Sequence, residues 1–169
     1  MPDVSTEVAI ATQTINNSPT TVVLSSIPAT YTDLRIVMVR PGSSGTSAGY
    51  PSISAINGST TTDKNYTIMY GDGAATGSFR GATQSNIILS NGGGTAYSAF
   101  TLDVFSYSNA TTFKSMLGVS MSDTNGGGYV DTVIGMWRST AAINSITFTS
   151  NAGTNGFQPG TTITVYGIL

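Results

Sequence analysis

The stretch Gly135–Ile146 reads Gly-Met-Trp-Arg-Ser-Thr-Ala-Ala-Ile-Asn-Ser-Ile and contains Trp137, the only tryptophan of the chain. We interpret it as a strand, a turn over Ser139–Ala142 and the start of a second strand. Near the C-terminus, Thr161–Tyr166 alternates hydroxyl-bearing side chains with aliphatic ones, which is typical of a half-buried strand. This part of the chain therefore predicts a β-sheet that includes the C-terminal residues.

The same short alternating runs continue along the whole sequence, and turn residues separate them. Asn-Gly pairs at residues 57–58, 91–92, 125–126 and 155–156 mark positions where the backbone can adopt the positive φ of tight turns. No segment keeps an apolar helical period over several turns, so no substantial helix is expected. The predicted strands are Glu7–Ile15, Thr21–Leu24, Leu34–Arg40, Ser52–Asn57, Tyr66–Tyr70, Asn86–Leu89, Ala99–Tyr107, Phe113–Met121, Tyr129–Arg138, Ile143–Thr149 and Thr161–Tyr166.

The predicted fold is an all-β, single-domain antiparallel β-sandwich, jelly-roll-like, with about ten strands. The sandwich is expected to span residues 7–169, and a short N-terminal arm is expected at residues 1–6. A length of 169 residues is enough for one domain with a substantial hydrophobic core.

Local patterns lead to three further expectations. The segments Glu7–Ile15 and Thr21–Leu24 flank Asn16–Pro19, a turn cluster that predicts a first hairpin. Gly71–Gly81 is expected to form a loop. Apolar residues share one face of Phe113–Met121, and several other strands have apolar residues on both faces, which indicates that some strand faces contact another subunit.

The composition limits the partners that the protein can bind. Charged residues make up 8% of the chain, with six basic and eight acidic side chains, against about 25% in an ordinary globular domain. The scattered basic residues form no stripe for phosphates, so no nucleic acid is expected as a partner. The absence of cysteine excludes disulfides and thiolate metal sites. No signal peptide and no long apolar run is found, so no membrane partner is expected.

Candidates for catalysis are few because the chain contains no histidine. This removes the commonest general base and every Ser-His triad. A serine paired with Lys64 or Lys114 is conceivable but weakly supported. Asp103, Asp123 and Asp131 are the candidates for a glycosidase-like carboxylate pair, but we expect Asp103 and Asp131 on outward strand faces and Asp123 at a turn. We therefore assign no catalytic residue, no cofactor and no metal ligand.

Several short motifs occur in a characteristic order. They are Ile27–Leu34, Asn65-Tyr66, Arg80-Gly81, Phe105–Lys114, Gly135–Ile143, Phe157, Pro159–Thr161 and Tyr166–Ile168. Together they resemble small β-sandwich virion proteins of tailed phages, especially phages of cyanobacteria and marine bacteria. The resemblance implies a homotrimer without catalysis. It also implies a structural role for the motif residues, among which Trp137, Arg138, Tyr166 and Gly167 form the structural signature.

The first functional hypothesis is a trimeric capsid decoration (cement) protein. It would bind the major capsid protein on the outer surface of the phage head and stabilise the shell, after assembly in the host cytoplasm. The expected capsid-binding arm consists of Pro2, Asp3, Val4, Ser5 and Thr6, which precede the first strand pattern.

The alternative hypothesis is a receptor-binding tip of a tail fibre or head appendage that recognises host-surface glycan. The loops Pro41–Gly49, Gly71–Gly81 and Asn151–Phe157 would then contact sugar. Aromatic residues at positions 50, 97, 129 and 137 are a candidate stacking platform, although strand aromatics more often lie in a core or a subunit contact. An enzyme such as a capsule depolymerase is a weaker third hypothesis.

Deletion of residues 1–6 is expected to weaken attachment to phage heads and to leave the fold intact, because the arm precedes the first predicted strand. Co-sedimentation with heads measures the attachment, and circular dichroism measures the fold. Unchanged binding of the shortened chain to heads would contradict this role for the arm.

Overall fold

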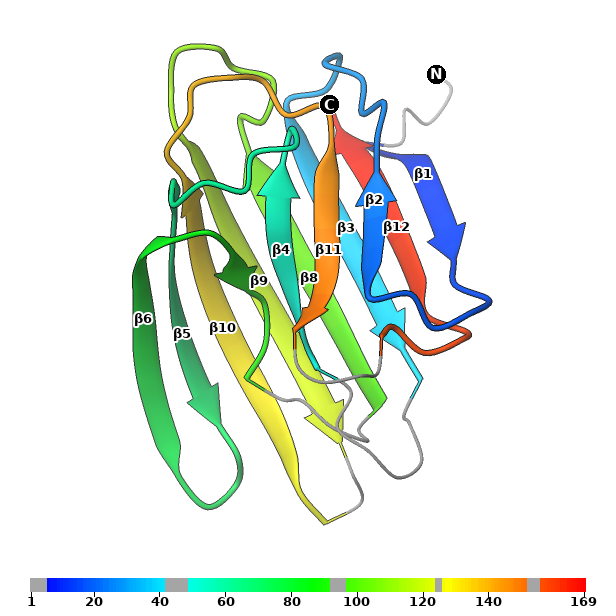
Figure 1. The fold of residues 1–169 in the computed structure, drawn as a ribbon, viewed down its shortest axis with the longest axis vertical. Helices are drawn as coiled ribbons and strands as arrows, with labels where there is room; N and C mark the ends of the chain where they lie inside the picture. The colour runs from blue at the N-terminus through cyan, green and yellow to red at the C-terminus, as the bar shows by residue number, and fades with distance from the viewer. Residues whose placement is uncertain (1–5, 42–48, 92–96, 124–125, 152–155) are drawn as a thin grey trace.

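Two β-sheets make up the described part of the chain, which comprises residues 6–41, 49–91, 97–123, 126–151 and 156–169 of a computed structural model (Figure 1). The large sheet has eight strands and the small sheet has four, and neighbouring strands run antiparallel. The described residues contain no helix. The all-β sandwich predicted from the sequence is confirmed, with twelve strands in place of about ten.

Within each sheet, the spatial order of the strands differs from their order in the chain. In spatial order, the large sheet consists of β1 (Glu7–Thr14), β12 (Thr162–Ile168), β3 (Asp33–Arg40), β8 (Tyr97–Phe105), β9 (Lys114–Asp123), β10 (Gly128–Trp137), β5 (Lys64–Gly71) and β6 (Thr76–Gln84). The small sheet consists of β2 (Thr21–Leu24), β11 (Ile146–Asn151), β4 (Tyr50–Ile56) and β7 (Ile87–Ile88).

Eight of the strands follow the order of a jelly roll. The row β1-β12-β3-β8 lies in the large sheet and the row β2-β11-β4-β7 lies in the small one, so the chain crosses between sheets at each of the steps β1–β2, β3–β4, β7–β8 and β11–β12. The hairpins β5–β6 and β9–β10 are additions that extend the large sheet. Figure 1 shows β5 and β6 at its far edge, beyond the strands of the small sheet.

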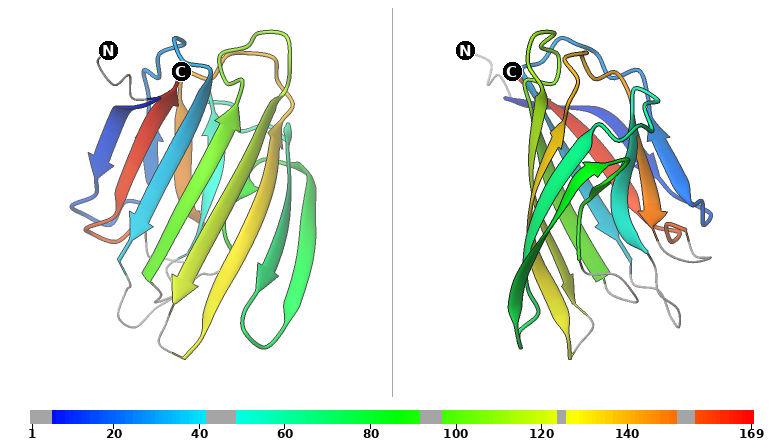
Figure 2. Two further views of the ribbon diagram at one scale, coloured as in Figure 1. Left: turned by 180° about the vertical axis from the view of Figure 1, so that it is seen from behind. Right: turned by 60° about the vertical axis from the view of Figure 1, so that its left-hand side comes forward.

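The core lies between the two sheets, where alternate residues of facing strands are buried. The alternation expected for β8 and β12 is confirmed, and β3, which has apolar residues on both sides, lies inside the large sheet as expected. The fully or almost fully buried members of these three strands are Leu34, Ile36, Met38, Phe100, Leu102, Val104, Ile163 and Val165. They pack in one cluster with buried residues of the small sheet, among them Ile53, Ile56, Ile146 and Phe148. Figure 2 shows the two layers from the side.

The expected first hairpin is wrong. β1 pairs with β12, and β2 pairs with β11 in the other sheet. The turn cluster Asn16–Pro19 does redirect the chain, but it carries the chain across the sandwich. Turn residues specify a change of direction and leave the sheet partner undetermined.

The expected loop Gly71–Gly81 is also wrong, because it contains the start of β6. This edge strand has few apolar residues of its own, and glycines occupy two of its positions. Gly77 pairs with Tyr70 and Gly81 pairs with Tyr66 across the hairpin. Each tyrosine ring occupies the space that a side chain at the paired glycine position would need. The neighbouring strand therefore supplies the apolar cover that β6 lacks.

The sequence motifs around Tyr31 and Tyr107 pack together at one end of the sandwich. Tyr107 is fully buried, its hydroxyl donates a hydrogen bond to the Pro28 carbonyl, and the Tyr31 amide donates to the same hydroxyl at 3.3 Å. The Tyr31 ring covers Gly167 so closely that a Cβ at that position would overlap it. The glycine of the C-terminal motif is thus required by a ring more than 130 residues earlier in the sequence.

Gly167→Ala is expected to lower the free energy of unfolding by about 1–3 kcal/mol, because the added methyl group forces the Tyr31 ring out of its place. Gly71→Ala is the matched control, since a Cβ there meets only Thr76 Cγ2 at 3.8 Å. Urea denaturation of both variants measures the difference. Equal unfolding midpoints for the two variants would contradict the packing argument.

Candidate interaction surface

The strand β9 presents its more apolar side to solvent. Its inward positions are Lys114, Met116, Gly118, Ser120 and Ser122, whereas Leu117, Val119 and Met121 point away from the small sheet. The inward residues of β9 can be small because side chains of neighbouring strands fill the space above them. A Cβ on Gly118, for example, would lie 3.0 Å from the Phe100 ring. The apolar face expected for Phe113–Met121 exists, and it is the exposed one.

Neighbouring strands continue this exposed apolar side. Val130 lies beside Met121, and Ile134 lies beside Leu117, in the β9–β10 register. Thr132 is flanked by Val119 on β9 and by a methionine on β5. We call the whole set the apolar outer face; its members are 39% to 63% exposed and are Val39, Met69, Leu117, Val119, Met121, Val130, Ile134 and Met136.

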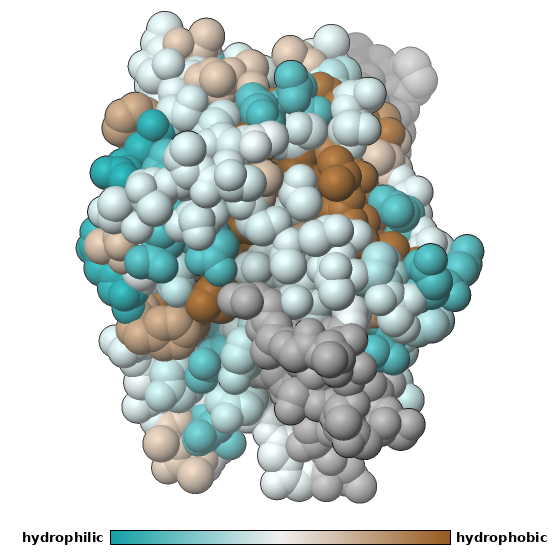
Figure 3. Space-filling view, in the orientation of Figure 1, coloured by the Kyte–Doolittle hydropathy of each residue, from teal (hydrophilic) through white to brown (hydrophobic). Residues whose placement is uncertain are grey.

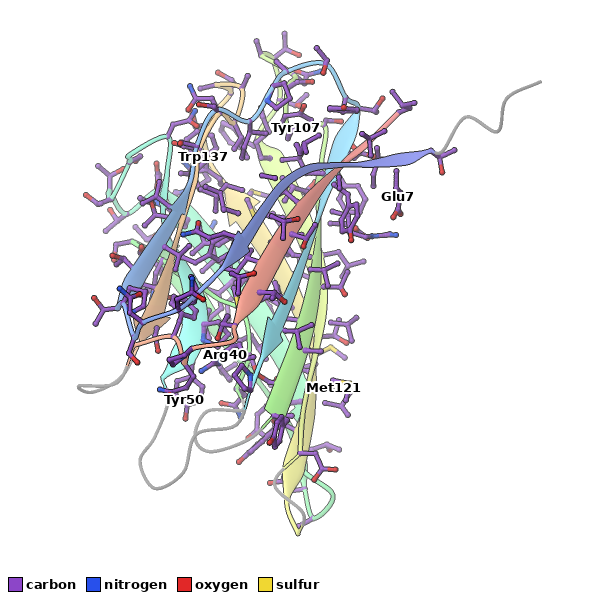
Figure 4. The ribbon with its side chains drawn as sticks, turned by 90° about the vertical axis from the view of Figure 1, so that its right-hand side faces the viewer. Glu7, Arg40, Tyr50, Tyr107, Met121 and Trp137 are labelled. Carbon is purple, nitrogen blue, oxygen red and sulfur yellow. The ribbon has the colours of Figure 1, made fainter. Side chains whose placement is uncertain are left out.

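The apolar outer face is the side of the large sheet turned away from the small sheet. The left view of Figure 2 looks directly onto it, and Figure 4 shows Met121 on this side, with Arg40 and Trp137 between the sheets. The opposite side of the molecule, over the small sheet, is mostly hydrophilic to neutral in Figure 3, with a smaller hydrophobic area. The two broad faces of the sandwich therefore differ in character.

An ion-pair network borders the apolar outer face. The Arg35 guanidinium contacts Asp103 through Nε at 2.8 Å and Nη2 at 3.1 Å, and it contacts Glu7 through Nη1 at 2.5 Å. The hydrogen bond to Asp103 raises the pKa of Arg35 above its ordinary value and outweighs the opposing effect of burial. The expected outward position of Asp103 is confirmed, and its carboxylate is paired with Arg35.

The outward position expected for Asp131 is wrong. Its side chain is fully buried between the sheets, where Oδ2 accepts hydrogen bonds from Ser90 Oγ at 2.8 Å and Ser120 Oγ at 2.6 Å. The other carboxylate oxygen, Oδ1, has no partner among the described residues. Asp103 and Asp131 lie on opposite faces of the large sheet, so they do not form the carboxylate pair of a glycosidase. The sequence of β10 has polar residues in both phases of the strand, so it did not indicate that the Asp131 side chain points inward.

The two candidate lysines are buried structural groups on either side of Trp137. Lys64 Nζ lies 2.7 Å from Asp63 Oδ1 and also donates to two carbonyls. Lys114 Nζ donates to the carbonyls of Asn109, Thr112 and Thr140, and burial lowers its pKa. The bonds that both ammonium groups make within the described residues include no serine hydroxyl, so no Ser-Lys pair is seen there.

The residues of the structural signature lie in well-defined contacts. Trp137 is 2% exposed, and its Nε1 donates to Asp63 Oδ2 at 2.8 Å. Arg138 Nη2 donates to the Thr62 carbonyl at 2.7 Å, so within the described residues it neither pairs with a carboxylate nor is seen to stack on Trp137. Tyr166 is half-buried on the outer side of the large sheet, opposite Arg35 in the register.

Most of the expected capsid-binding arm, Pro2, Asp3, Val4 and Ser5, lies outside the described residues. Thr6 is described and exposed, and its carbonyl accepts a hydrogen bond from the Leu169 amide at 3.2 Å. This bond places residue 6 beside the last residue of the chain, at the outer edge of the large sheet.

The four aromatic residues considered as a sugar platform do not gather. Trp137 and Tyr129 lie at opposite ends of β10, and Tyr50 begins β4 in the small sheet. Tyr97 is 71% exposed at the start of β8, two strands away from Tyr129. Tyr129 instead joins Tyr70, with ring centroids 6.3 Å apart. It also lines an open hollow of about 470 Å³ together with Asp72, Asp123 and the glycines of two turns.

Comparisons with protein-family models, with curated proteins and with solved structures find no match for this chain. The functional argument therefore depends on the residues themselves. Within the described part of the chain, no three His, Cys, Asp or Glu side chains gather in a way that could hold a metal ion. None of its segments is a helix long and apolar enough to cross a membrane.

The Asp63 carboxylate makes the end of the sandwich around Trp137 sensitive to acid. Burial alone would raise its pKa, but hydrogen bonds from Lys64, Trp137 and Ser59 and the charge of Lys64 lower it from 3.8 to about 2. A lowered folded-state pKa stabilises the fold above the unfolded value, and this contribution is lost as the pH falls through the folded value. The difference corresponds to about 2 kcal/mol.

Asp63→Asn is expected to lower the free energy of unfolding by about 2 kcal/mol near neutral pH and by less than about 0.5 kcal/mol near pH 2, because about half of the wild-type carboxylate is protonated at its folded-state pKa. Trp137→Phe removes one donor to Asp63, so the acid limb of its stability profile should move to higher pH. Urea unfolding followed by circular dichroism over this pH range measures both effects. A constant difference between wild type and Asp63→Asn would contradict the coupling.

Proposed function

We propose that this protein is a non-catalytic structural component of a tailed-phage particle, a trimeric decoration protein that binds the major capsid protein on the outer surface of the head. The observation that carries the proposal is the placement of the charged and the apolar side chains. Lys64 and Lys114 are buried and Asp103 is paired with Arg35, while the apolar outer face, which spans the sheet from β3 to β5, is left exposed.

The fold supports the same proposal by analogy. Double-sheet jelly rolls are common in viral shell proteins, although the same fold also occurs in lectins and enzymes. A jelly roll with extensive sheets offers broad, rigid faces for contact with neighbouring proteins. The motifs that resemble virion proteins supply the contacts at one end of the sandwich, such as Tyr107 with Pro28 and Trp137 with Asp63.

Stabilisation of the head would follow from mass action. A protein that binds the assembled shell and not the free subunits shifts the assembly equilibrium toward the shell. The bond between Thr6 and Leu169 fixes the start of the described chain at one edge of the large sheet.

The proposal predicts saturable co-sedimentation of the purified protein with phage heads that lack it, with no binding to host cells in the parallel arm of the experiment. The oligomer should have the mass of three chains by light scattering at micromolar concentration. Binding to cells and not to heads would overturn the capsid proposal. A monomer by light scattering would overturn the trimer.

A second candidate function, a glycan-binding tip of a fibre or appendage, is favoured by one observation. The hollow lined by Asp72, Asp123 and Tyr129 combines carboxylates with an aromatic ring, which is a combination suited to hydroxyl-rich ligands. The cell-binding arm of the same experiment tests it, with Tyr129→Ala as the variant. Loss of cell binding in this variant, with the fold retained, would support the second function.

A further inference from the structure

We infer that the apolar outer face is an interface between copies of this chain, so that the occupant of this face is a second copy of the protein. The inference deepens the proposed trimer by assigning its contact surface. It does not depend on attachment to the capsid, because association between copies is measured on the purified protein.

The first argument is the size of the exposed surface. Its eight residues are each roughly half exposed, and a Val, Leu, Ile or Met side chain has about 100 Å² of apolar surface, so together they expose on the order of 400 Å² of apolar surface. The largest apolar patch of a typical monomer is about 300–600 Å². A standard protein interface buries about 800 Å² on each partner. The apolar outer face is therefore a patch of the size that is often functional in a monomer, and it is large enough to form the apolar centre of one side of an interface.

The second argument is the orientation of β9. The middle of its exposed side carries Leu117, Val119 and Met121, with Ser115 and Asp123 at the two ends, whereas Gly118 and Ser120 point into the sandwich. An isolated domain gains stability by turning the more apolar phase of a strand inward. The inverse arrangement in β9 costs no stability if the outward side chains are also removed from water. Packing of this sheet face against another sheet would remove them.

The third argument is charge, which favours a copy of the same chain over a partner of different chemistry. Two adjacent rows of this side of the sheet, one through Met121 and Val130 and one through Val119 and Thr132, carry no charged side chain, so these rows of two copies can meet without placing like charges together. At the border, Arg35 is already neutralised by Asp103 and Glu7. Arg80, on β6, lies beyond the opposite border. Within these two rows a charged partner would find no complementary group.

The fourth argument is shape. The apolar outer face runs from Val39 on β3 to Met69 on β5, and at about 4.8 Å per strand spacing this is roughly 19 Å across. Threonines such as Thr101 and Thr132 alternate with the larger side chains in the same rows, which gives a ridged surface that can interdigitate with a similar one. A face of this width can also be divided between two neighbours, as a threefold ring requires.

The experiment compares two substitutions of the same residue type at equal exposure. Val119 in the apolar outer face and Val23 on the outer side of β2 are both 54% exposed. Val119→Lys is expected to raise the dissociation constant of the oligomer at least about a hundredfold, because it buries an unpaired charge in the interface. Val23→Lys, the matched control, should leave the constant unchanged. Light scattering over a dilution series measures association, and circular dichroism checks that both variants fold.

A gentler variant keeps the test decisive if Val119→Lys fails to fold. Val119→Thr preserves the β-branched shape and is expected to weaken association by roughly fivefold, as an added hydroxyl group disfavours burial. A monomeric wild type, or an oligomer that Val119→Lys leaves intact, would overturn the inference. Loss of head binding by Val119→Lys in a protein that is monomeric from the start would show that the face contacts the capsid protein instead.

The outcomes separate this inference from the proposed function. An oligomer that dissociates on Val119→Lys but never binds heads supports the interface and contradicts the capsid proposal. A monomer that sediments with heads supports the capsid proposal and contradicts the interface between copies.

Discussion

One end of the sandwich contains two buried ammonium groups, those of Lys64 and Lys114, and the loops at this end must supply oxygen atoms to both of them. A charge removed from water is tolerated only when oxygen atoms replace its hydration shell. Lys64 obtains them from Asp63 and from turn carbonyls, and Lys114 obtains them from three carbonyls on two loops. Both loops must therefore close over the strand ends, and Trp137, which lies between the two lysines in the register, bonds to the same Asp63.

The sequence alone was sufficient to predict the inward and outward residues of the strands whose two sides differ clearly in hydrophobicity. In β8 and β12, apolar and polar residues largely alternate, and the structure buries the apolar phase as expected. The pairing of β1 with β12 was not predictable from local patterns, because it joins residues at opposite ends of the chain. β6 was missed because its neighbour's tyrosines replace the side chains that would have marked it as a strand.

The candidate surface was predictable only in part. Apolar residues on both sides of several strands indicated a contact between subunits, but the pattern did not say which side of β9 lies outside. That choice is made by tertiary packing, since the Phe100 ring occupies the space over Gly118 and leaves no need for a large inward residue there. Asp131 shows the same limit: only the buried serines beside it explain why an acid faces inward.

The position of β12 between two other strands of the large sheet has a consequence for the order of events during synthesis. β12 lies between β1 and β3, and β11 lies between β2 and β4. Both rows of the jelly roll therefore stay open, with unpaired strand edges, until residues 146–168 have left the ribosome. The hairpins β5–β6 and β9–β10 pair neighbours in the chain and can form earlier. Half of the extended sheet can thus assemble locally, while closure of the sandwich waits for its last two strands.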